Sequence, residues 1–350
     1  MSDMVETLGL DTSKDGASWH GKENPMNGLQ TAEQVEEFAG LHWLVQQMKT
    51  PHPMAYIPHP SIPDTFVLNP EVPQYVPGYM VNMRDTDKVV LGYVGERYKI
   101  IQNWEAFSFI DNLVGNKDAK FNSAGCLYNK YGVPSRIFIS AELQPTKVMG
   151  DDFRNYIVFT HSHDGMNAVR AFVTPIRVVC NNTLTLAIEG TKRTWATNHV
   201  GSIEAKLQAS QETLKLYKDY MAVFPVYAEK MAGFNLYDIE VGQILDVLFP
   251  DDGTQGNSRM SANAAAMRRS ILMSYEERQD SLKFHGTAWG LIQASTNVLG
   301  NMIPLRQTKH GQINREFKAV EGHPVVDRLQ RILDSLYEQE NPQEKEGEEY

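Results

Sequence analysis

Two imidazoles and a carboxylate lie within four residues in the segment His161-Ser-His-Asp164. In a β-strand, alternate side chains point to the same face, so His161 and His163 would face the same way. Imidazole and carboxylate groups are common zinc ligands, and a metal-assisted hydrolase or nuclease using these three residues is one hypothesis. No further His or Cys stands at a metal-site spacing, and histidines at a hairpin end are also common as plain surface groups.

Cys180, with Asn181 and Asn182 after it and histidines before it, could supply a nucleophile. It follows Val178-Val179, however, and a thiol in an apolar setting is usually buried and inert. We expect Asn181 and Asn182 to cap or brace the backbone, with ligand binding as the alternative. The sequence contains no phosphate-binding P-loop, dinucleotide-binding glycine motif or nucleophile elbow. It therefore favours a protein that is not an enzyme and has no cofactor or bound metal.

Basic residues lie on or beside predicted strands, with tyrosines among them. Basic groups on a sheet hold phosphates while aromatic rings stack on bases, the pattern of single-stranded nucleic-acid binding. Half-buried strand tyrosines are the alternative interpretation. The candidate DNA-binding residues are Arg97, Tyr98, Lys99, Arg136, Arg154, His161, His163, Arg170, Arg177, Asn181 and Asn182.

Charge is unevenly distributed along the 350 residues, whose net charge is −10. Residues 84–193 carry 14 basic and 11 acidic groups, and residues 253–333 carry 11 and 6. Residues 334–350 carry 1 basic and 7 acidic groups. Local fields rather than totals attract a polyanion, so the two positive blocks permit a nucleic-acid partner.

The candidate residues are positioned by a predicted hairpin. Residues 156–163 and 169–174 alternate as strands around an Asp164-Gly165 turn, and Asp-Gly is a strong hairpin signal. Apolar residues at helical spacing predict a helix from Cys180 to Gly190. Upstream, Thr31 reads as a helix N-cap, and residues 79–84 and 89–94 read as another hairpin. Eight of the seventeen prolines fall in residues 50–79, which indicates extended loops or edge strands.

The order of these elements predicts an α+β fold: an antiparallel β-sheet with hairpins packed by helices, then a helical C-terminal half. Helices are expected from Ser202 to about Pro225 and over residues 237–249, 262–279, 287–299 and 324–340. We expect an irregular lead-in over 1–30, a β-rich core over 31–200, a helical region over 201–340 and a disordered acidic tail over 341–350.

Several motifs together resemble the phage/plasmid-like family defined by domain of unknown function 932. These are Arg97-Tyr-Lys-Ile-Ile-Gln-Asn-Trp-Glu-Ala-Phe107, Ser123-Ala-Gly125, Ser162-His-Asp-Gly165, Pro175-Ile-Arg-Val-Val-Cys-Asn-Asn-Thr-Leu184, Thr287-Ala-Trp-Gly-Leu-Ile-Gln-Ala294 and Trp19-His20-Gly21. The resemblance covers about residues 18 to 330. It implies a phage or plasmid setting, near single-strand binding and recombination functions. The hairpin-rich sheet also resembles, by fold analogy, the Rad/Red-type single-strand annealing proteins.

The leading hypothesis is a cytoplasmic protein that binds single-stranded DNA and promotes strand annealing or recombination. Two far-separated cysteines, Cys126 and Cys180, form no disulfide framework, and no apolar run approaches the roughly 18 residues of a membrane span. Homo-oligomers are expected, and a single-strand binding protein or a host factor could dock on the acidic tail. An interaction protein that modulates a host factor is a further alternative.

Overall fold

The structure is a computed structural model that divides into two compact units. It describes residues 26, 28–115, 119–129, 131–177, 182–183, 186, 194–197, 199, 212–250, 258–277, 282–302 and 322–342. Unit 1 consists of Met1–Ala141, Val158–Ala171 and Trp195–Glu212, and unit 2 of Glu142–Ile157, Phe172–Thr194 and Thr213–Tyr350.

Unit 1 contains a three-stranded antiparallel sheet in which β4 (Tyr75–Arg84) lies between β1 (Val45–Pro51) and β5 (Val90–Gly95). The predicted hairpin over residues 79–94 is therefore confirmed. The Asp87 carboxylate accepts two hydrogen bonds from the Arg84 guanidinium at the turn between the two strands, from Nε to Oδ1 at 2.8 Å and from Nη2 to Oδ2 at 2.5 Å. This ion pair holds the pKa of Asp87 below its usual range and raises that of Arg84.

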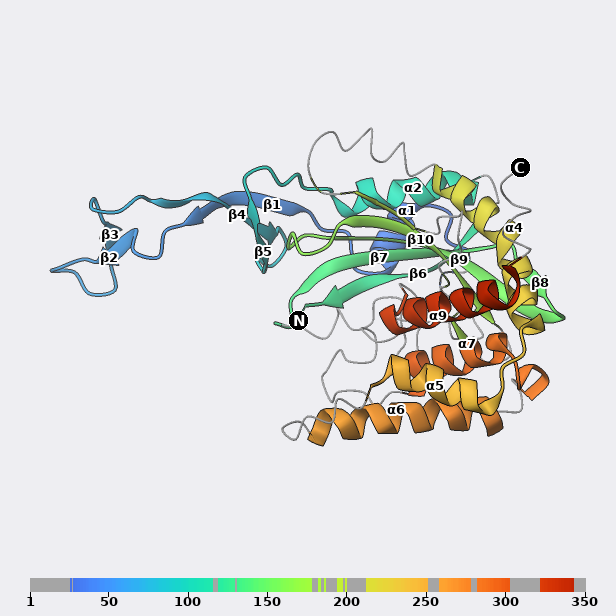
Figure 1. Ribbon diagram of the computed structural model, residues 1–350. Helices are drawn as coiled ribbons and strands as arrows, with labels where there is room; N and C mark the ends of the chain where they lie inside the picture. Colours follow the sequence, from blue (N-terminus) through green and yellow to red (C-terminus); the bar gives the residue numbers. More distant parts are fainter. Residues whose placement is uncertain are drawn as a thin grey trace. The chain divides into compact units, whose positions relative to one another are not determined.

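Residues 48–80, which we name the arm, extend from this sheet within unit 1 (Figure 1). The arm consists of the paired ends of β1 and β4 and a two-stranded antiparallel sheet, β2 (Tyr56–Pro58) with β3 (Phe66–Leu68). Proline removes a backbone donor and tolerates only edges and loops, which explains why the strands here are only three residues long. The expected extended and edge structure is present in β1, β2, β3 and their loops, but β4, which begins at Tyr75 and contains Pro77, is the middle strand of its sheet.

The second sheet has seven strands in the order β11-β10-β9-β7-β6, with β12 beside β10 and β8 beside β9. The pairs β8–β9 and β10–β11 are antiparallel. The boundary between the two units falls within β7, β9 and β10. The strands are β6 (Ala119–Tyr128), β7 (Pro134–Leu143), β8 (Thr146–Val148), β9 (Asp151–Ser162), β10 (Val169–Arg177), β11 (Asn182–Thr183) and β12 (Thr194–Thr197).

Two helices of unit 1, α1 (Ala32–Phe38) and α2 (Asn103–Gly115), pack against each other and against β6 (Figure 1). Thr31 caps α1 as predicted, with its hydroxyl accepting the Gln34 N–H at 3.3 Å and the Gln34 side chain reaching back. Asp111 of α2 accepts the backbone N–H of Ala32, so the second helix also satisfies the start of the first.

The helices of unit 2 enclose one hydrophobic core centred on large aromatic side chains. Phe224 contacts the rings of Phe153 at 5.5 Å and Trp289 at 6.2 Å, and all three are buried. Helices α5, α6, α7 and α9 pack around this core (Figure 1). The helices of unit 2 are α4 (Glu212–Gly233), α5 (Asp238–Leu248), α6 (Ser258–Glu277), the 3₁₀ helix η2 (Leu282–Phe284), α7 (Ala288–Asn297), the π-helix η3 (Val298–Met302) and α9 (Pro324–Glu340).

Two local predictions are wrong. Helix α4 does not end near Pro225 but runs through it to Gly233, because Ala228 and Met231 beyond the proline are buried in the core and their packing offsets the missing hydrogen bond. Asn182 lies in the short strand β11, paired with Arg177, instead of in a helix from 180 to 190. The rest of that predicted helix, apart from Leu186, lies outside the described residues.

The predicted α+β class is confirmed, because antiparallel sheets are followed by helices from residue 212 onward. The predicted helices over 237–249, 262–279, 287–299 and 324–340 are each present to within four residues at either end. In the part of the chain that is described, no helix has the length and apolar character needed to cross a membrane.

Candidate functional site

The loop between β9 and β10 is the first component of the site. β9 ends at Ser162 and β10 begins at Val169, so six residues connect the strands instead of a two-residue turn at Asp164-Gly165. The Asp164 carboxylate explains the wider loop, because it accepts the Ser135 hydroxyl at 2.6 Å and the Met166 N–H at 2.9 Å. Gly165 takes a left-handed backbone, with φ of 72°. The loop is thus braced by its own carboxylate.

Strand β5 lies directly against this loop. A Cβ atom added at Gly92 would stand 2.4 Å from the Asp164 Cα, a separation that real Cβ atoms do not reach. The glycine at position 92 therefore permits a close backbone approach. Asn82 of the neighbouring β4 also contacts this loop, since its side-chain amide donates a hydrogen bond to the His163 carbonyl at 2.7 Å.

The extended segment after β5 alternates between solvent and interior. Arg97 and Lys99 are exposed, whereas Tyr98 between them is 9% exposed. The Tyr98 hydroxyl donates to the Ser162 carbonyl, and its ring stacks on His199 at 4.6 Å between centroids. His199 in turn accepts the Lys99 N–H at 2.7 Å through its backbone carbonyl. Tyr98 therefore works as an inward anchor that holds two cationic side chains outward.

A pocket of about 750 Å³ opens between these elements inside unit 1. Residues of β5, the segment 95–98, the loop 164–168 and His199 line it. Two large side chains at its surface are unusually exposed, Tyr93 at 63% and Met166 at 77%. The pocket thus combines a free aromatic face, an apolar side chain and the Arg97 cation.

Beneath the pocket lies a buried cluster of His161, His163 and His199. The His161 ring meets that of His163 at 4.7 Å between centroids, edge to face, and that of His199 at 6.2 Å. His163 contacts the Asn103 side-chain oxygen through Nε2 at 3.0 Å. Because the Asn103 amide group donates to the Leu41 carbonyl, its oxygen must accept, and His163 therefore carries its proton on Nε2.

Burial keeps His161 and His163 neutral. Loss of hydration lowers the pKa of His163 to about 3 and that of His161 well below its usual value, and the neighbouring histidines lower both further. Neither ring nitrogen of His161 has a hydrogen-bond partner in the described structure. A buried polar atom without a partner costs stability, so the interior of unit 1 holds a destabilising feature at this point.

The metal-site hypothesis finds no support in this geometry. Among the residues that are described, no group of three or more His, Cys, Asp and Glu side chains is arranged to hold a metal ion. Asp164 directs one carboxylate oxygen to Ser135 and the other to the Met166 N–H. The histidines lie in the interior beside aromatic rings, with Trp43 edge-on to His163 at 5.4 Å.

Comparison with known families gives one match. Residues 90–320 match a family described as Domain of unknown function (DUF932), and this match spans about two thirds of the chain. The chain belongs to the DUF932 family. No curated protein and no solved structure matches it. The DUF932 region begins at the first residue of β5 and includes the loop 163–168, Tyr98 and all three buried histidines, whereas the arm precedes it.

The structure separates the predicted DNA-binding residues into different environments. Arg97 and Lys99 are exposed at or beside the pocket, whereas Tyr98, His161 and His163 are buried and so cannot contact DNA in this conformation. The half-buried residues of the predicted set engage other protein groups: Arg136 donates to the Thr160 hydroxyl at 3.2 Å, Arg154 pairs with Glu142 at 3.9 Å, and Arg170 is also only partly exposed.

The remaining predicted residues are placed less fully. Arg177 and Asn182 pair across β10 and β11 through their backbones, and Asn181 lies outside the described residues, as does Cys180. Cys126 is buried, which raises the pKa of its thiol to about 12 and makes it a poor nucleophile.

The sequence analysis missed the residues that shape the site from other elements. Tyr93 is exposed although Leu91, two residues before it, is buried, because a register shift in β5 at Leu91 interrupts the alternation; the sequence pattern alone therefore did not mark this ring. Asn82, Asn103 and His199 carry no local signal, because their role comes from contacts with residues 60 to 100 positions away.

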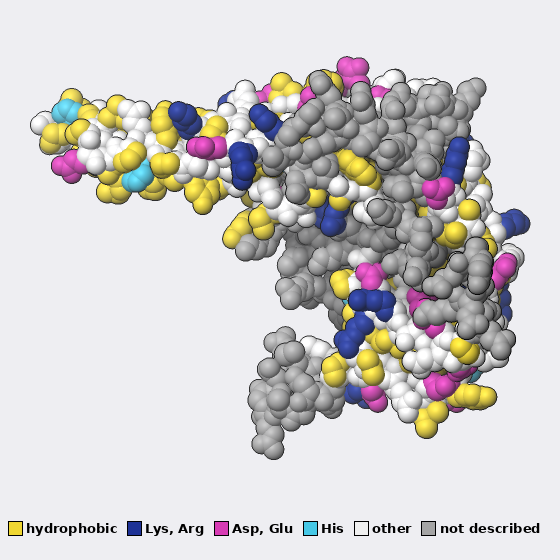
Figure 2. Space-filling model, turned by 45° about the horizontal axis from the view of Figure 1, so that its top comes forward, with side chains coloured by type: hydrophobic (Ala, Val, Ile, Leu, Met, Phe, Trp, Pro, Cys, Tyr) yellow, Lys and Arg dark blue, Asp and Glu magenta, His cyan; other side chains and the backbone are white. Residues whose placement is uncertain are grey.

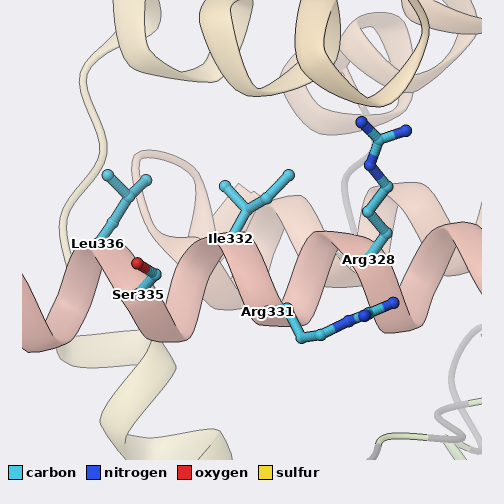
Figure 3. Close-up of a pocket in the computed structure, with 5 residues that line it drawn as sticks. All are labelled: Arg328, Arg331, Ile332, Ser335 and Leu336. Atoms are coloured by element: carbon cyan, nitrogen blue, oxygen red, sulfur yellow. The ribbon is translucent and has the colours of Figure 1, made fainter.

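A second pocket, of about 440 Å³, lies on α9 in unit 2 (Figure 3). Arg328, Ile332 and Leu336 project from one side of the helix at four-residue spacing, while Arg331 points elsewhere. Ile332 and Leu336 also pack against the hydrophobic core of unit 2. This surface offers two cations but no exposed aromatic ring.

Proposed function

We propose that the protein binds single-stranded DNA without chemical conversion, and that a nucleotide lies in the pocket of unit 1. The supporting observation is the alternation at residues 97–99, where buried Tyr98 fixes two exposed cations beside the exposed Tyr93 ring. Cations that follow a backbone and an aromatic face for bases are the two components that single-strand binding requires.

The size and chemistry of the pocket are compatible with a nucleotide. A volume of about 750 Å³ falls within the range of small-molecule sites. Tyr93 offers a stacking face, and each stacked base contributes about 1–3 kcal/mol. Arg97 presents a planar guanidinium that suits a phosphate better than an ammonium group does.

The acidic side chains at the pocket are engaged with protein groups, which limits their repulsion of phosphate. Glu96 accepts the Gly78 N–H at 3.0 Å through one carboxylate oxygen. Asp164 is 8% exposed and accepts hydrogen bonds at both oxygens. Arg97 and Lys99 are exposed, as is Glu96, so two cations face one exposed carboxylate at the pocket opening.

We propose that this DNA binding serves strand annealing or recombination in a phage or plasmid setting. Figure 2 shows Lys and Arg side chains among hydrophobic ones where the arm meets the rest of unit 1. Binding that depends on backbone contacts and stacking is sequence-tolerant, as annealing requires. The acidic tail would then serve as a contact for a single-strand binding protein or a host factor.

The test is a titration of a labelled single-stranded oligonucleotide, followed by fluorescence anisotropy at about 50 mM and about 200 mM salt. We expect affinity to fall about twentyfold at the higher salt if roughly three phosphates are contacted. The double variant Arg97→Ala/Lys99→Ala should bind about tenfold more weakly at low salt. Its salt slope should also decrease by about 0.7 for each lost phosphate contact.

Two further variants separate stacking from charge. Tyr93→Ala should weaken binding about fivefold or more while leaving the salt slope unchanged, because the ring carries no charge. Lys218→Ala, which removes an exposed cation of α4, serves as the control for charge loss in general. Absence of binding at low salt, or equal losses for Lys218→Ala and Arg97→Ala/Lys99→Ala, would contradict the proposal.

A further inference from the structure

The arm exposes an unusual amount of apolar surface. Eight of its large hydrophobic side chains are between 45% and 63% exposed. With about 200 Å² for a whole large side chain, they present on the order of 800 Å², whereas scattered single residues are the norm for a monomer. The eight are Met48, Met54, Tyr56, Ile62, Phe66, Leu68, Tyr75 and Tyr79.

The β2–β3 sheet concentrates part of this surface on one face. Tyr56 pairs with Leu68 and Pro58 with Phe66, and these alternate positions point to the same side. All four side chains are exposed, whereas Ile57 and Val67 on the other face are partly covered. A two-stranded sheet alone is marginally stable in water, so this apolar face requires something to pack against it.

We infer that the arm is a self-association surface, through which two copies of the chain pack the exposed faces of their β2–β3 sheets together. Two identical patches can pair around a twofold axis only if the patch is complementary to itself in shape and charge. Residues 48–80 satisfy this condition, since their only Lys, Arg, Asp or Glu residues are Lys49, Asp64 and Glu71, of mixed sign. Like-charge repulsion between two arms is therefore small.

The arm also directs the contact to the sheet face instead of the strand edge. Proline cannot donate to a neighbouring strand, and β2 contains Pro58 with Pro60 close behind it. Addition of a further strand at the β2 edge is therefore disfavoured, whereas β3 (Phe66–Leu68) contains no proline. Face-to-face packing at about 10 Å between sheets remains, with the side chains of both copies interleaved.

The size of the surface fits a stable dimer. Standard interfaces bury about 800 Å² on each partner, which the exposed side chains of the whole arm reach together; Tyr56, Phe66 and Leu68 on the β2–β3 face supply about 340 Å² of it. The composition fits as well, because aromatic residues and methionine are enriched at interfaces and most charged residues are depleted. A polyanion is a poor occupant for a surface with one lysine, and the arm lies before the DUF932 region that holds the proposed DNA site.

The experiment measures the mass of the full-length protein by light scattering during size-exclusion chromatography. The wild-type chain should run at twice its mass of 39.6 kDa. The double variant Tyr56→Ser/Phe66→Ser should run as a monomer at the same concentration. Both side chains are more than half exposed within one copy of the chain, so the variant should keep the circular dichroism spectrum of the wild type, which shows that it is folded.

The matched control is Ile239→Ser/Val247→Ser on α5, which removes side chains that are 71% and 51% exposed in unit 2. It should remain a dimer. A cysteine on this face, Pro58→Cys, should give a cross-linked dimer with a short bis-maleimide. The wild type treated in parallel shows any background from its own cysteines.

Three results would overturn the inference. One is a wild-type chain that stays monomeric at every concentration tested. A second is a dimer that persists in Tyr56→Ser/Phe66→Ser. The third is a monomer that floats with phosphatidylcholine/phosphatidylglycerol vesicles and loses flotation in Tyr56→Ser/Phe66→Ser, which would assign the arm to a lipid surface. None of these results depends on DNA binding, so the two proposals can fail separately.

Discussion

The interiors of the two units differ in the chemistry of their polar groups. The described residues include six buried side chains of the ionisable types Glu, Arg, His and Asp, and all six belong to unit 1: Glu36, Arg84, His161, His163, Asp164 and His199. The buried polar side chains of unit 2 are amides and hydroxyls, such as Asn155, Gln293 and Gln330. Unit 2 thus has the features of a structural scaffold. Unit 1 carries buried ionisable groups, and a contribution to stability alone does not explain why they are buried.

This difference indicates where function should be sought. Burying ionisable groups costs free energy unless they are paired, and proteins retain such groups where a site needs them. In unit 1 this cost in folding free energy arises beneath the pocket, where neither ring nitrogen of His161 has a hydrogen-bond partner. The hydrophobic core of unit 2 has no comparable cluster among its described residues.

The largest expected effect tests the scaffold. Phe224→Ala removes a fully buried ring that contacts Phe153, Tyr220 and Trp289, and should lower the free energy of unfolding by about 3–5 kcal/mol. Val226→Ala on the same helix, at a side chain that is 64% exposed, should change it by less than about 0.5 kcal/mol. Urea denaturation measures both. A small loss for Phe224→Ala would refute the view of unit 2 as a tightly packed core.

An intermediate effect tests the contact between β5 and the loop 163–168. Gly92→Ala places a Cβ 2.4 Å from the Asp164 backbone, and should cost about 1–3 kcal/mol through overpacking. Gly95→Ala on the same strand meets no atom within 4 Å and should be nearly neutral.

The substitution at Gly92 also probes the pocket. The displaced loop should weaken oligonucleotide binding in Gly92→Ala, measured in the titration described above. Equal stability of Gly92→Ala and Gly95→Ala would show that the loop moves freely and that the brace at Asp164 does not hold it.

The smallest effect concerns pH. The folded pKa of His161 lies well below the unfolded value of about 6.5, so below that pH the unfolded chain binds a proton that the folded chain does not. Stability is therefore lost as pH falls, by about 1.4 kcal/mol for each unit below about 6.5 for one such histidine. The variant His161→Leu should therefore lose less unfolding free energy than the wild type as pH falls below about 6.5. At pH 8 it should be as stable as the wild type or more stable, because the substitution breaks no hydrogen bond.

The pH measurement needs two controls. Burial raises the pKa of Glu36 to about 7, so that residue costs stability as pH rises from about 4.5 to 7, the opposite trend. Its contribution is common to the wild type and His161→Leu and cancels in their difference. His285→Leu removes an exposed histidine of unit 2 for comparison. Identical pH profiles for the wild type and His161→Leu would mean that His161 does not titrate in the expected direction.

The sequence predicted elements better than it predicted the site. Caps and periodicity lie in neighbouring residues, so Thr31 and the helices over 237–340 were placed correctly. Pro225 was misjudged because tertiary packing decides whether a proline ends a helix. The exposed role of Arg97 and Lys99 agrees with strand alternation, but burial of Tyr98, His161 and His163 depends on β4, α2 and residue 199, which local patterns do not reveal.

The composition of the arm has a practical consequence for limited proteolysis. Residues 48–80 contain a single tryptic cleavage site, after Lys49, so trypsin would leave the arm almost uncut however accessible it is. Chymotrypsin should instead cut after Tyr56, Phe66 and Tyr75, which are solvent-facing within one copy of the chain, and should cut faster in the monomeric Tyr56→Ser/Phe66→Ser variant after Tyr75 than in the dimer. A tryptic digest alone would therefore report the most exposed segment of unit 1 as its most resistant one. Comparing the two proteases would correct that error.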